Sequence, residues 1–204
     1  MTEVPSATDK PSNFNIANAL TVLRIVGVPF FGWLLLAEGG DSIGFRVAAW
    51  GAFFLLMITD RIDGDLARSR NLVTKFGQVA DPIADKALMG MAFVGLSIIG
   101  VLWWWVTIVV LVREWGITIM RFFMLRYGVM PASKGGKVKT MLQSFALAGY
   151  ILPFEIWDNP VSDVLRWATH ILMALALIVT VTTAIQYVRD AVVLRREQKA
   201  LAQS

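Results

Sequence analysis

The chain has 204 residues, 56% of them hydrophobic, and a formal net charge of +4 at pH 7. The hydrophobic residues form long blocks, which excludes an ordinary water-soluble domain and a disordered chain and is typical of an integral membrane protein. Because there is no cysteine and only one histidine, His170, disulfides, thiolate metal sites and metal sites built from several histidines are excluded.

The apolar blocks predict an all-α integral membrane protein with six transmembrane helices and an N-terminal interfacial helix. Residues 1–14 are polar and are expected to form a flexible cytoplasmic tail. The segment 15–24 alternates polar and apolar residues at helical spacing and is expected to lie along the membrane interface, continued by a first span at 25–37. The other spans are expected at 47–67, 83–102, 103–128, 141–154 and 164–188, so that the membrane domain covers 15–194 and a basic cytoplasmic tail covers 195–204.

The basic residues lie mostly in short segments on one side of the predicted spans. Arg46 and Arg166 are almost the only cations on the opposite side. Cytoplasmic segments of membrane proteins carry such an excess of lysine and arginine, so we expect both termini and the functional site at the cytoplasmic face of the cell membrane. The positive charge is therefore assigned to topology and to anionic lipid headgroups, and not to binding of nucleic acid.

Four aspartates stand at or inside the ends of the second and third spans: Asp60, Asp63, Asp81 and Asp85. An ionisable group at membrane depth costs at least ~2.5–3.5 kcal/mol, so such groups indicate a functional site by default. If both segments are helical, Asp60 and Asp63 share one face, and Asp81 and Asp85 are one turn apart on the next helix. We expect the two helices to direct all four carboxylates into one cavity, an environment that hard divalent cations such as Mg²⁺ and Mn²⁺ prefer.

Small and basic residues continue the same helix face. Gly64, Ala67 and Arg68 fall with the first two aspartates in a stripe of roughly 140°. Gly64 and Ala67 leave room for a ligand to approach the backbone, and Arg68 offers a planar fork of donors that suits phosphate. Carboxylates, missing side-chain bulk and a phosphate-binding fork together predict metal-assisted chemistry on a phosphate ester.

These residues form the pattern D-x2-D-G-x2-A-R-x8-G-x3-D-x3-D, which resembles the signature of the CDP-alcohol phosphotransferases, integral membrane enzymes of phospholipid synthesis. The positions that match without a gap are Asp60, Asp63, Gly64, Ala67, Arg68, Gly77, Asp81 and Asp85. The resemblance implies that CDP-diacylglycerol enters laterally from the bilayer and that an alcohol displaces CMP from it, with two divalent ions, Mg²⁺ or Mn²⁺. The first three aspartates are then the principal metal ligands, and Asp85 contacts a metal and acts as general base.

The resemblance also assigns residues to the CDP-diacylglycerol. Gly64, Ala67 and Arg68 would hold its CDP moiety, together with Thr74, which matches a hydroxyl residue that the family places near the nucleotide. The family commonly opens with an Asn-rich, Thr-x-x-Arg helix over the mouth of the active site. The matching residues are Asn15, Asn18, Thr21 and Arg24. Asn18 and Thr21 are therefore expected to bind the CDP-diacylglycerol, while interfacial anchoring is an equally open interpretation of this stretch.

A second set of charges lies in the fourth predicted span and in the basic segment after it, which is expected to be a loop at 129–140. Arg113 and Glu114, followed by Gly-Lys-Val-Lys-Thr at 136–140, resemble the phosphatidylglycerophosphate synthases of the family, in which a basic pocket receives the phosphate of sn-glycerol 3-phosphate. A doubly negative acceptor needs such cations. The residues expected to bind the acceptor phosphate are Arg113, Arg121, Lys137 and Lys139. A salt bridge that only holds helices together is the alternative for the charges of the fourth span.

Three other functions stay open at this point. A sister enzyme would use inositol phosphate, serine or, as a cardiolipin synthase, phosphatidylglycerol as acceptor, and the aspartate motif does not separate these. A cation transporter would use the intramembrane carboxylates, although such sites usually lie at the midplane between repeated halves. A catalytically inactive scaffold is the third, and the intact motif argues against it. The family is often dimeric, so a second copy of the chain is among the partners to be considered.

Overall fold

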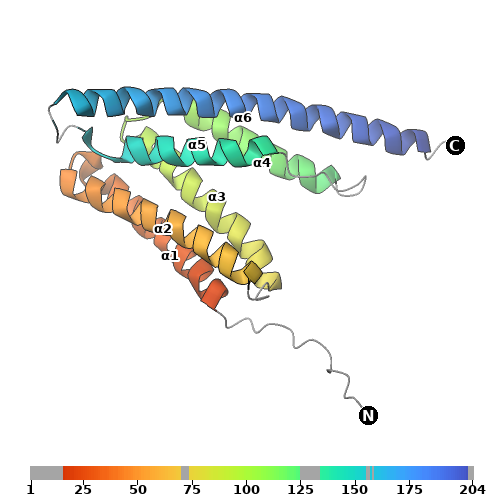
Figure 1. The fold of residues 1–204 in the computed structure, drawn as a ribbon, viewed down its shortest axis with the longest axis horizontal. Helices are drawn as coiled ribbons and strands as arrows, with labels where there is room; N and C mark the ends of the chain where they lie inside the picture. The colour runs from red at the N-terminus through yellow and green to blue at the C-terminus, as the bar shows by residue number, and fades with distance from the viewer. Residues whose placement is uncertain (1–15, 70–73, 125–133, 155–156, 158, 202–204) are drawn as a thin grey trace, which may run out of the picture.

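The computed structural model describes residues 16–69, 74–124, 134–154, 157 and 159–201. Side chains inside these ranges are not described at 17, 61, 63–69, 75–76, 78–79, 134, 137 and 197–201. The helices are α1 (Ile16–Leu36), the 3₁₀-helix η1 (Ala37–Gly40), α2 (Ile43–Ser69), α3 (Lys75–Ile98), α4 (Trp104–Met124), α5 (Lys134–Ile151) and α6 (Pro160–Leu201) (Figure 1). No β-strand occurs among the described residues, so the predicted all-α class is confirmed.

Three of these helices are long and apolar enough to cross a bilayer. The candidate spans are Asn18–Gly40, Ile43–Asp60 and Pro160–Arg196. By contrast, α3, α4 and α5 each contain at least three charged residues. Charged groups at membrane depth normally face the protein interior or a water-filled cavity. The chain is thus a membrane protein, and a polar functional site is expected among the three charged helices α3, α4 and α5.

The N-terminal helix differs from the prediction of a separate interfacial helix. A single helix, α1, runs from Ile16 to Leu36 through Pro29. Its polar residues Asn18, Thr21 and Arg24 are buried, so the first part of α1 packs into the protein rather than lying along the membrane surface. The alternation of polar and apolar residues that suggested an interfacial helix therefore marks a helix with one polar face turned towards its neighbours.

Four other helices are longer than the predicted spans: α2, which starts at Ile43 and ends at Ser69, α3, which starts at Lys75, and the two helices α5 and α6. Residues 134–140 belong to α5 instead of a loop, and the rest of the predicted loop, 129–133, lies outside the described residues. The C-terminal segment after the predicted span continues α6 to Leu201, because it is rich in the good helix formers Arg, Glu, Gln, Lys, Ala and Leu. With 42 residues, α6 is about 60 Å long, roughly twice the thickness of the hydrocarbon core of a bilayer.

The helices form two groups that meet at α5. α1 packs on α2 and α3, whereas α6 packs along α5 and also contacts α4 (Figure 1). Contacts of α2 and α3 with α5 join the groups, and a continuous apolar core runs through both. Its fully buried members include Phe31, Leu35, Phe53, Phe93 and Leu147. The charged ends of α2, α3, α4 and α5 lie towards the same end of the bundle, at which α6 also ends.

The contact between α5 and α6 depends on Gly149. A Cβ atom at this position would lie 2.8 Å from the Cγ2 atom of Thr169 and closer still to its Oγ1 atom. We expect Gly149→Ala to lower the free energy of unfolding by about 1–3 kcal/mol, because the helices have to separate to admit the methyl group. Gly51→Ala is the matched control, since nothing lies within 4 Å of a Cβ atom there. Thermal unfolding in detergent measures the stability of both variants. Equal midpoint temperatures for Gly149→Ala and Gly51→Ala would contradict the close contact.

Candidate active site

The side chains of α1 hold the aspartates of the motif. Arg24 Nη1 donates a hydrogen bond to Asp60 Oδ1 and forms an ion pair with it. Arg24 is fully buried, whereas the Asp60 side chain is 41% exposed. One turn earlier on α1, Thr21 Oγ1 donates to Asp81 Oδ1 at 2.6 Å. A carboxylate that accepts hydrogen bonds from fixed donors keeps one orientation, so α1 orients one aspartate on α2 and another on α3.

The first turn of α3 packs against the same part of α1. Thr74 is the N-cap of α3, where its Oγ1 atom accepts a hydrogen bond from the backbone N–H of Gly77 at 3.0 Å. The same hydroxyl donates to Asn18 Oδ1 at 2.9 Å. A Cβ atom at Gly77 would lie 3.1 Å from Asn18 Oδ1 and 3.7 Å from Asp81 Oδ2. The glycine of the motif therefore allows α1 to approach α3 closely beside an aspartate.

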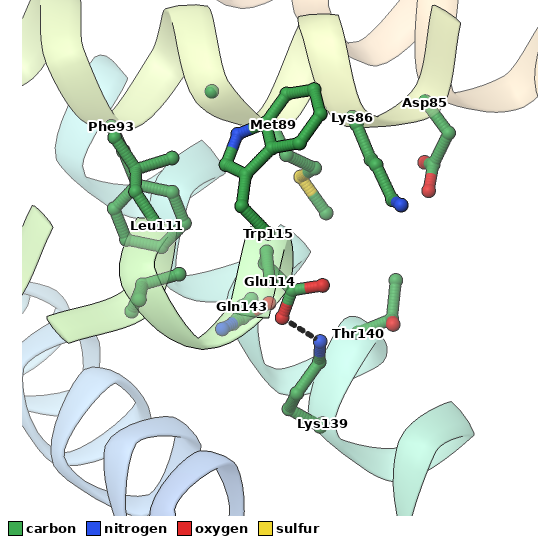
Figure 2. A pocket seen from close by; sticks show the side chains of 12 residues that line it. Asp85, Lys86, Met89, Phe93, Leu111, Glu114, Trp115, Lys139, Thr140 and Gln143 are labelled. Atoms are coloured by element: carbon green, nitrogen blue, oxygen red, sulfur yellow. Dashed lines mark hydrogen bonds and ion pairs between the residues drawn. The ribbon is translucent and has the colours of Figure 1, made fainter. Parts of the chain in front are cut away.

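The other aspartate of α3, Asp85, opens onto a cavity between α3, α4 and α5. Its polar lining comes from Asp85 and Lys86 on α3, Glu114 on α4, and Lys139 and Thr140 on α5 (Figure 2). Gln143 of α5 adds to the polar lining, and apolar side chains such as Met89, Phe93 and Leu111 make up much of the rest. The like charges of Asp60 and Glu114 and the opposite charges of Arg24 and Lys139 all act on the Asp85 carboxylate. Asp85 therefore lies one turn after Asp81 on α3 and shares a cavity with the charged residues of α4 and α5.

Charged residues of α4 and α5 are linked through Glu114. Lys139 Nζ donates to Glu114 Oε1, and Arg113 Nη1 donates to the same oxygen at 3.0 Å. The Arg113 guanidinium also donates from Nη2 to Thr183 Oγ1 at 2.9 Å and lies over the Tyr187 ring, 5.9 Å from its centroid. Arg113 thus faces α6, whereas Glu114 and Lys139 face the cavity. The structural salt bridge considered for these charges is present, and it borders the cavity.

The remaining predicted site residues differ in how far they are described. Arg121 is exposed on α4, two turns beyond Arg113. The continuous helix α2 carries the predicted stripe of the motif. For five of them only the helical backbone is described: Asp63, Gly64, Ala67, Arg68 and Lys137. The roles assigned to all of these residues stay predictions.

A model of the CDP-alcohol phosphatidyltransferase family matches residues 14–182, which include all of the elements above except the end of α6. The chain belongs to this family. It is 46% identical over 177 residues to the probable phosphatidylglycerophosphate synthase of Mycobacterium tuberculosis (strain CDC 1551 / Oshkosh), covering 87% of this chain and 81% of that protein.

Two further relatives have lower identity to this chain. The CDP-diacylglycerol–glycerol-3-phosphate 3-phosphatidyltransferase of Bacillus subtilis (strain 168) is 35% identical over 167 residues, covering 76% of this chain and 86% of that protein. The enzyme of the same name from Escherichia coli (strain K12) is 34% identical over 184 residues, covering 87% and 95%. The similarity thus extends over nearly the whole membrane domain, and the family resemblance seen in the aspartate motif is confirmed.

Members of the CDP-alcohol phosphatidyltransferase family generally use a divalent metal ion, and the donor chemistry of this site fits one. Asp60, Asp81 and Asp85 offer only carboxylate oxygens, the ligands of hard cations. Arg24 and Thr21 act as the outer partners that orient such ligands. Among the residues whose side chains are described, no three acidic, histidine or cysteine residues are grouped closely enough to hold a metal, and the Asp63 side chain lies outside that set.

Sequence reasoning did not single out several residues that the structure places in the site. Arg24 was noted in the opening helix of the family but was given no role, and it forms the ion pair with Asp60. Lys86, Thr140 and Gln143 line the cavity (Figure 2). For Lys86 a signal was available, because any charge inside an apolar helix indicates function. Thr140 ends the Gly-Lys-Val-Lys-Thr segment that carries the resemblance but was given no role. For Gln143 no signal existed, since its place in the cavity arises only from the packing of α5.

Proposed function

We propose that this chain transfers the phosphatidyl group of CDP-diacylglycerol to sn-glycerol 3-phosphate, giving phosphatidylglycerophosphate and CMP. The family and the names of the relatives support this reaction. The structural observation that carries it is that Asp85 and Lys139 line one cavity (Figure 2). The carboxylate that we propose as proton acceptor and the ammonium group that we propose as phosphate ligand would thus lie on opposite walls of the space that an acceptor would enter.

The donor end of the site lies at the contact of α1, α2 and α3. Asn18, Thr21 and Thr74 would bind the CDP-diacylglycerol from α1 and the start of α3, and Gly64, Ala67 and Arg68 would do so from α2. The support is that Asn18, Thr74 and the close approach at Gly77 form one buried polar contact. A nucleotide bound beside it would place its pyrophosphate next to Asp60 and Asp81, within reach of lipid that enters from the bilayer.

Two divalent ions, Mg²⁺ or Mn²⁺, would be held by Asp60, Asp63, Asp81 and Asp85. When bound, these ions supply positive charge to the pyrophosphate oxygens and to the leaving CMP. The protein's own contribution is orientation: Arg24 fixes Asp60, and Thr21 fixes Asp81. Because both donors are buried on α1, the two carboxylates are held in place before any ligand arrives.

The acceptor reaction needs a base and an anchor. A hydroxyl oxygen of the acceptor forms a new bond to the phosphorus of the phosphatidyl group, and the bond from that phosphorus to the bridging oxygen breaks, so that CMP leaves with this oxygen. Asp85 accepts the hydroxyl proton, as a positioned general base does. Lys139, together with Arg121 and Lys137, would hold the acceptor phosphate, since a dianion is best bound by several charged donors. Arg113, also predicted to bind this phosphate, faces α6 and would contribute through its ion pair with Glu114 at the border of the cavity.

The arrangement in the cell follows the charge distribution. All six α-helices would form the membrane domain, with both termini and the active site on the cytoplasmic side of the cell membrane, because the basic residues gather there. A homodimer is proposed from the behaviour of the family alone.

Metal removal separates this function from a transporter or an inactive scaffold. Purified protein in detergent is incubated with CDP-diacylglycerol and sn-glycerol 3-phosphate, and CMP release is followed. We expect release with Mg²⁺ or Mn²⁺ and a fall of at least about 100-fold after chelation, because metal charge on the phosphoryl oxygens lowers the barrier by several kcal/mol. Re-addition of the metal should restore the rate. The absence of CMP release under all conditions would contradict the proposed reaction and favour the transporter or scaffold.

A further inference from the structure

Lys86 lies on the wall of the cavity, next to Asp85 on α3. Its Nζ atom donates a hydrogen bond to Thr118 Oγ1 on α4 and lies 5.7 Å from the centroid of the Trp115 ring. Figure 2 shows the Lys86 amine and the Asp85 carboxylate directed into the same space, opposite Glu114, Lys139 and Thr140. Lys86 therefore adds a positive charge to the cavity, beyond the lysines and arginines already assigned to the acceptor phosphate.

The two lysines of the cavity differ in their partners. Lys139 is paired with the carboxylate of Glu114. Among the side chains that the structure describes, Lys86 has a hydroxyl and an aromatic face as partners and no carboxylate. A cation inside an apolar helix without an anionic partner is costly to maintain, so a ligand that brings negative charge would be bound favourably.

The position of Lys86 on α3 decides which part of a ligand it meets. Asp81 and Gly77 face α1, where the nucleotide contacts lie. Lys86 follows Asp81 by five residues, a rotation of roughly 140° around the helix, and its contacts are with α4. The anion that approaches Lys86 is therefore on the α4–α5 side of Asp85, where Lys139 and Thr140 also lie, and not on the nucleotide side.

We propose that Lys86 is a specificity-determining residue that binds the phosphate of the acceptor. This inference rests on the proposed function. Thr118 and Trp115 hold the ammonium at the edge of the cavity before the acceptor arrives, and the phosphate then supplies the missing counter-charge opposite Lys139. An acceptor without a phosphate, such as free serine or inositol, leaves Lys86 without an anion and is bound more weakly.

Steady-state kinetics of Lys86→Met test this role. Methionine keeps the length of the side chain and removes its charge. We expect KM for sn-glycerol 3-phosphate to rise by about 10–100-fold, the effect of losing one charge-assisted hydrogen bond, while KM for CDP-diacylglycerol changes by less than about twofold. Lys86→Arg should retain most of the affinity, because it keeps the charge. Inorganic phosphate should inhibit the wild type competitively with the acceptor, and Lys86→Met much less.

Thr118→Val distinguishes phosphate binding from a purely structural role. It removes the hydrogen-bond acceptor of Lys86 but leaves the ammonium in the cavity beside Trp115, so KM for the acceptor should rise far less than in Lys86→Met. Equal effects of the two variants, or a failure of Lys86→Arg to retain affinity, would overturn the proposal. A rise in KM for CDP-diacylglycerol instead would assign Lys86 to the donor and would overturn it as well.

Failure of the inference and failure of the proposed function have different signatures. Wild-type protein that makes no lipid from sn-glycerol 3-phosphate would refute the proposed function, and with it the role of Lys86. Active wild type with an unchanged acceptor KM in Lys86→Met would refute the role of Lys86 alone. Thermal unfolding in detergent verifies the fold of each variant, and Lys86→Gln serves the same comparison if the methionine variant does not fold.

Discussion

Replacement of Asp85 by asparagine is expected to lower kcat by about 10³-fold, within the range that general-base catalysis contributes. Asparagine has nearly the same size and shape, so the packing of α3 is preserved, but its amide cannot accept the proton of the acceptor hydroxyl. Asp85 is the aspartate that lines the cavity shared with Lys139, and it is therefore placed to act on the acceptor. Initial rates of CMP release at saturating substrates measure the effect.

The control for this variant is Asp190→Asn, which removes an exposed carboxylate on α6 and should leave kcat within about twofold, as expected for a surface substitution away from the site. Both proteins should unfold at the wild-type temperature. Retention by Asp85→Asn of more than about a tenth of the wild-type kcat would be incompatible with a general base worth at least 10²-fold.

Replacement of Arg24 by methionine is expected to affect both stability and activity. The substitution leaves Asp60 without its buried cationic partner. Removal of one member of a buried ion pair costs 3–5 kcal/mol, and we expect about 3 kcal/mol here, because the Asp60 side chain is 41% exposed and therefore partly solvated. Activity should fall by about 10–100-fold, as it does when an outer partner of a metal-ligating carboxylate is lost.

A double-mutant cycle isolates the ion pair. In Arg24→Met with Asp60→Asn both charges of this ion pair are removed, so thermal stability should recover in part while activity stays lost. A coupling energy of about 1–3 kcal/mol between the two sites is expected for residues in direct contact. Arg166→Met, which removes an exposed cation on α6, should change neither quantity. Additive losses of stability in the double variant would show that Arg24 does not act through Asp60.

Much of the fold follows from the pattern of apolar and charged residues. The second span was predicted to continue as a helix into the aspartate motif, which brings Asp60 and Asp63 to one face. The helix α2 does run unbroken to Ser69. The one-turn spacing of Asp81 and Asp85 on α3 was predicted on the same ground. The start of α5 was not, because a basic segment with glycines is equally compatible with a loop until its packing partner is known. The full length of α6 was not either, because a basic C-terminal segment is equally compatible with a tail.

Contacts between helices were beyond prediction because they depend on how each helix is rotated and which neighbour it meets. Arg24 had the same polar character as an interfacial anchor, and only the packing of α1 on α2 shows that it reaches Asp60. Arg113 and Glu114 are adjacent in sequence, yet a rotation of about 100° per residue sends one to α6 and the other to the cavity. The motif therefore located the site, whereas the partners of each aspartate required the structure.

The identity of the lipid product tests the central claim most directly. Purified protein is given CDP-diacylglycerol in vesicles that contain phosphatidylglycerol, with Mg²⁺ and equal concentrations of sn-glycerol 3-phosphate, inositol phosphate and serine, and the lipids are identified by mass spectrometry. Phosphatidylglycerophosphate should be the dominant product, formed in an amount equal to the CMP released. A dominant product of phosphatidylinositol phosphate, phosphatidylserine or cardiolipin would contradict the proposed acceptor. Phosphatidylserine as that product would also contradict the roles of Lys86 and Lys139, because serine carries no phosphate.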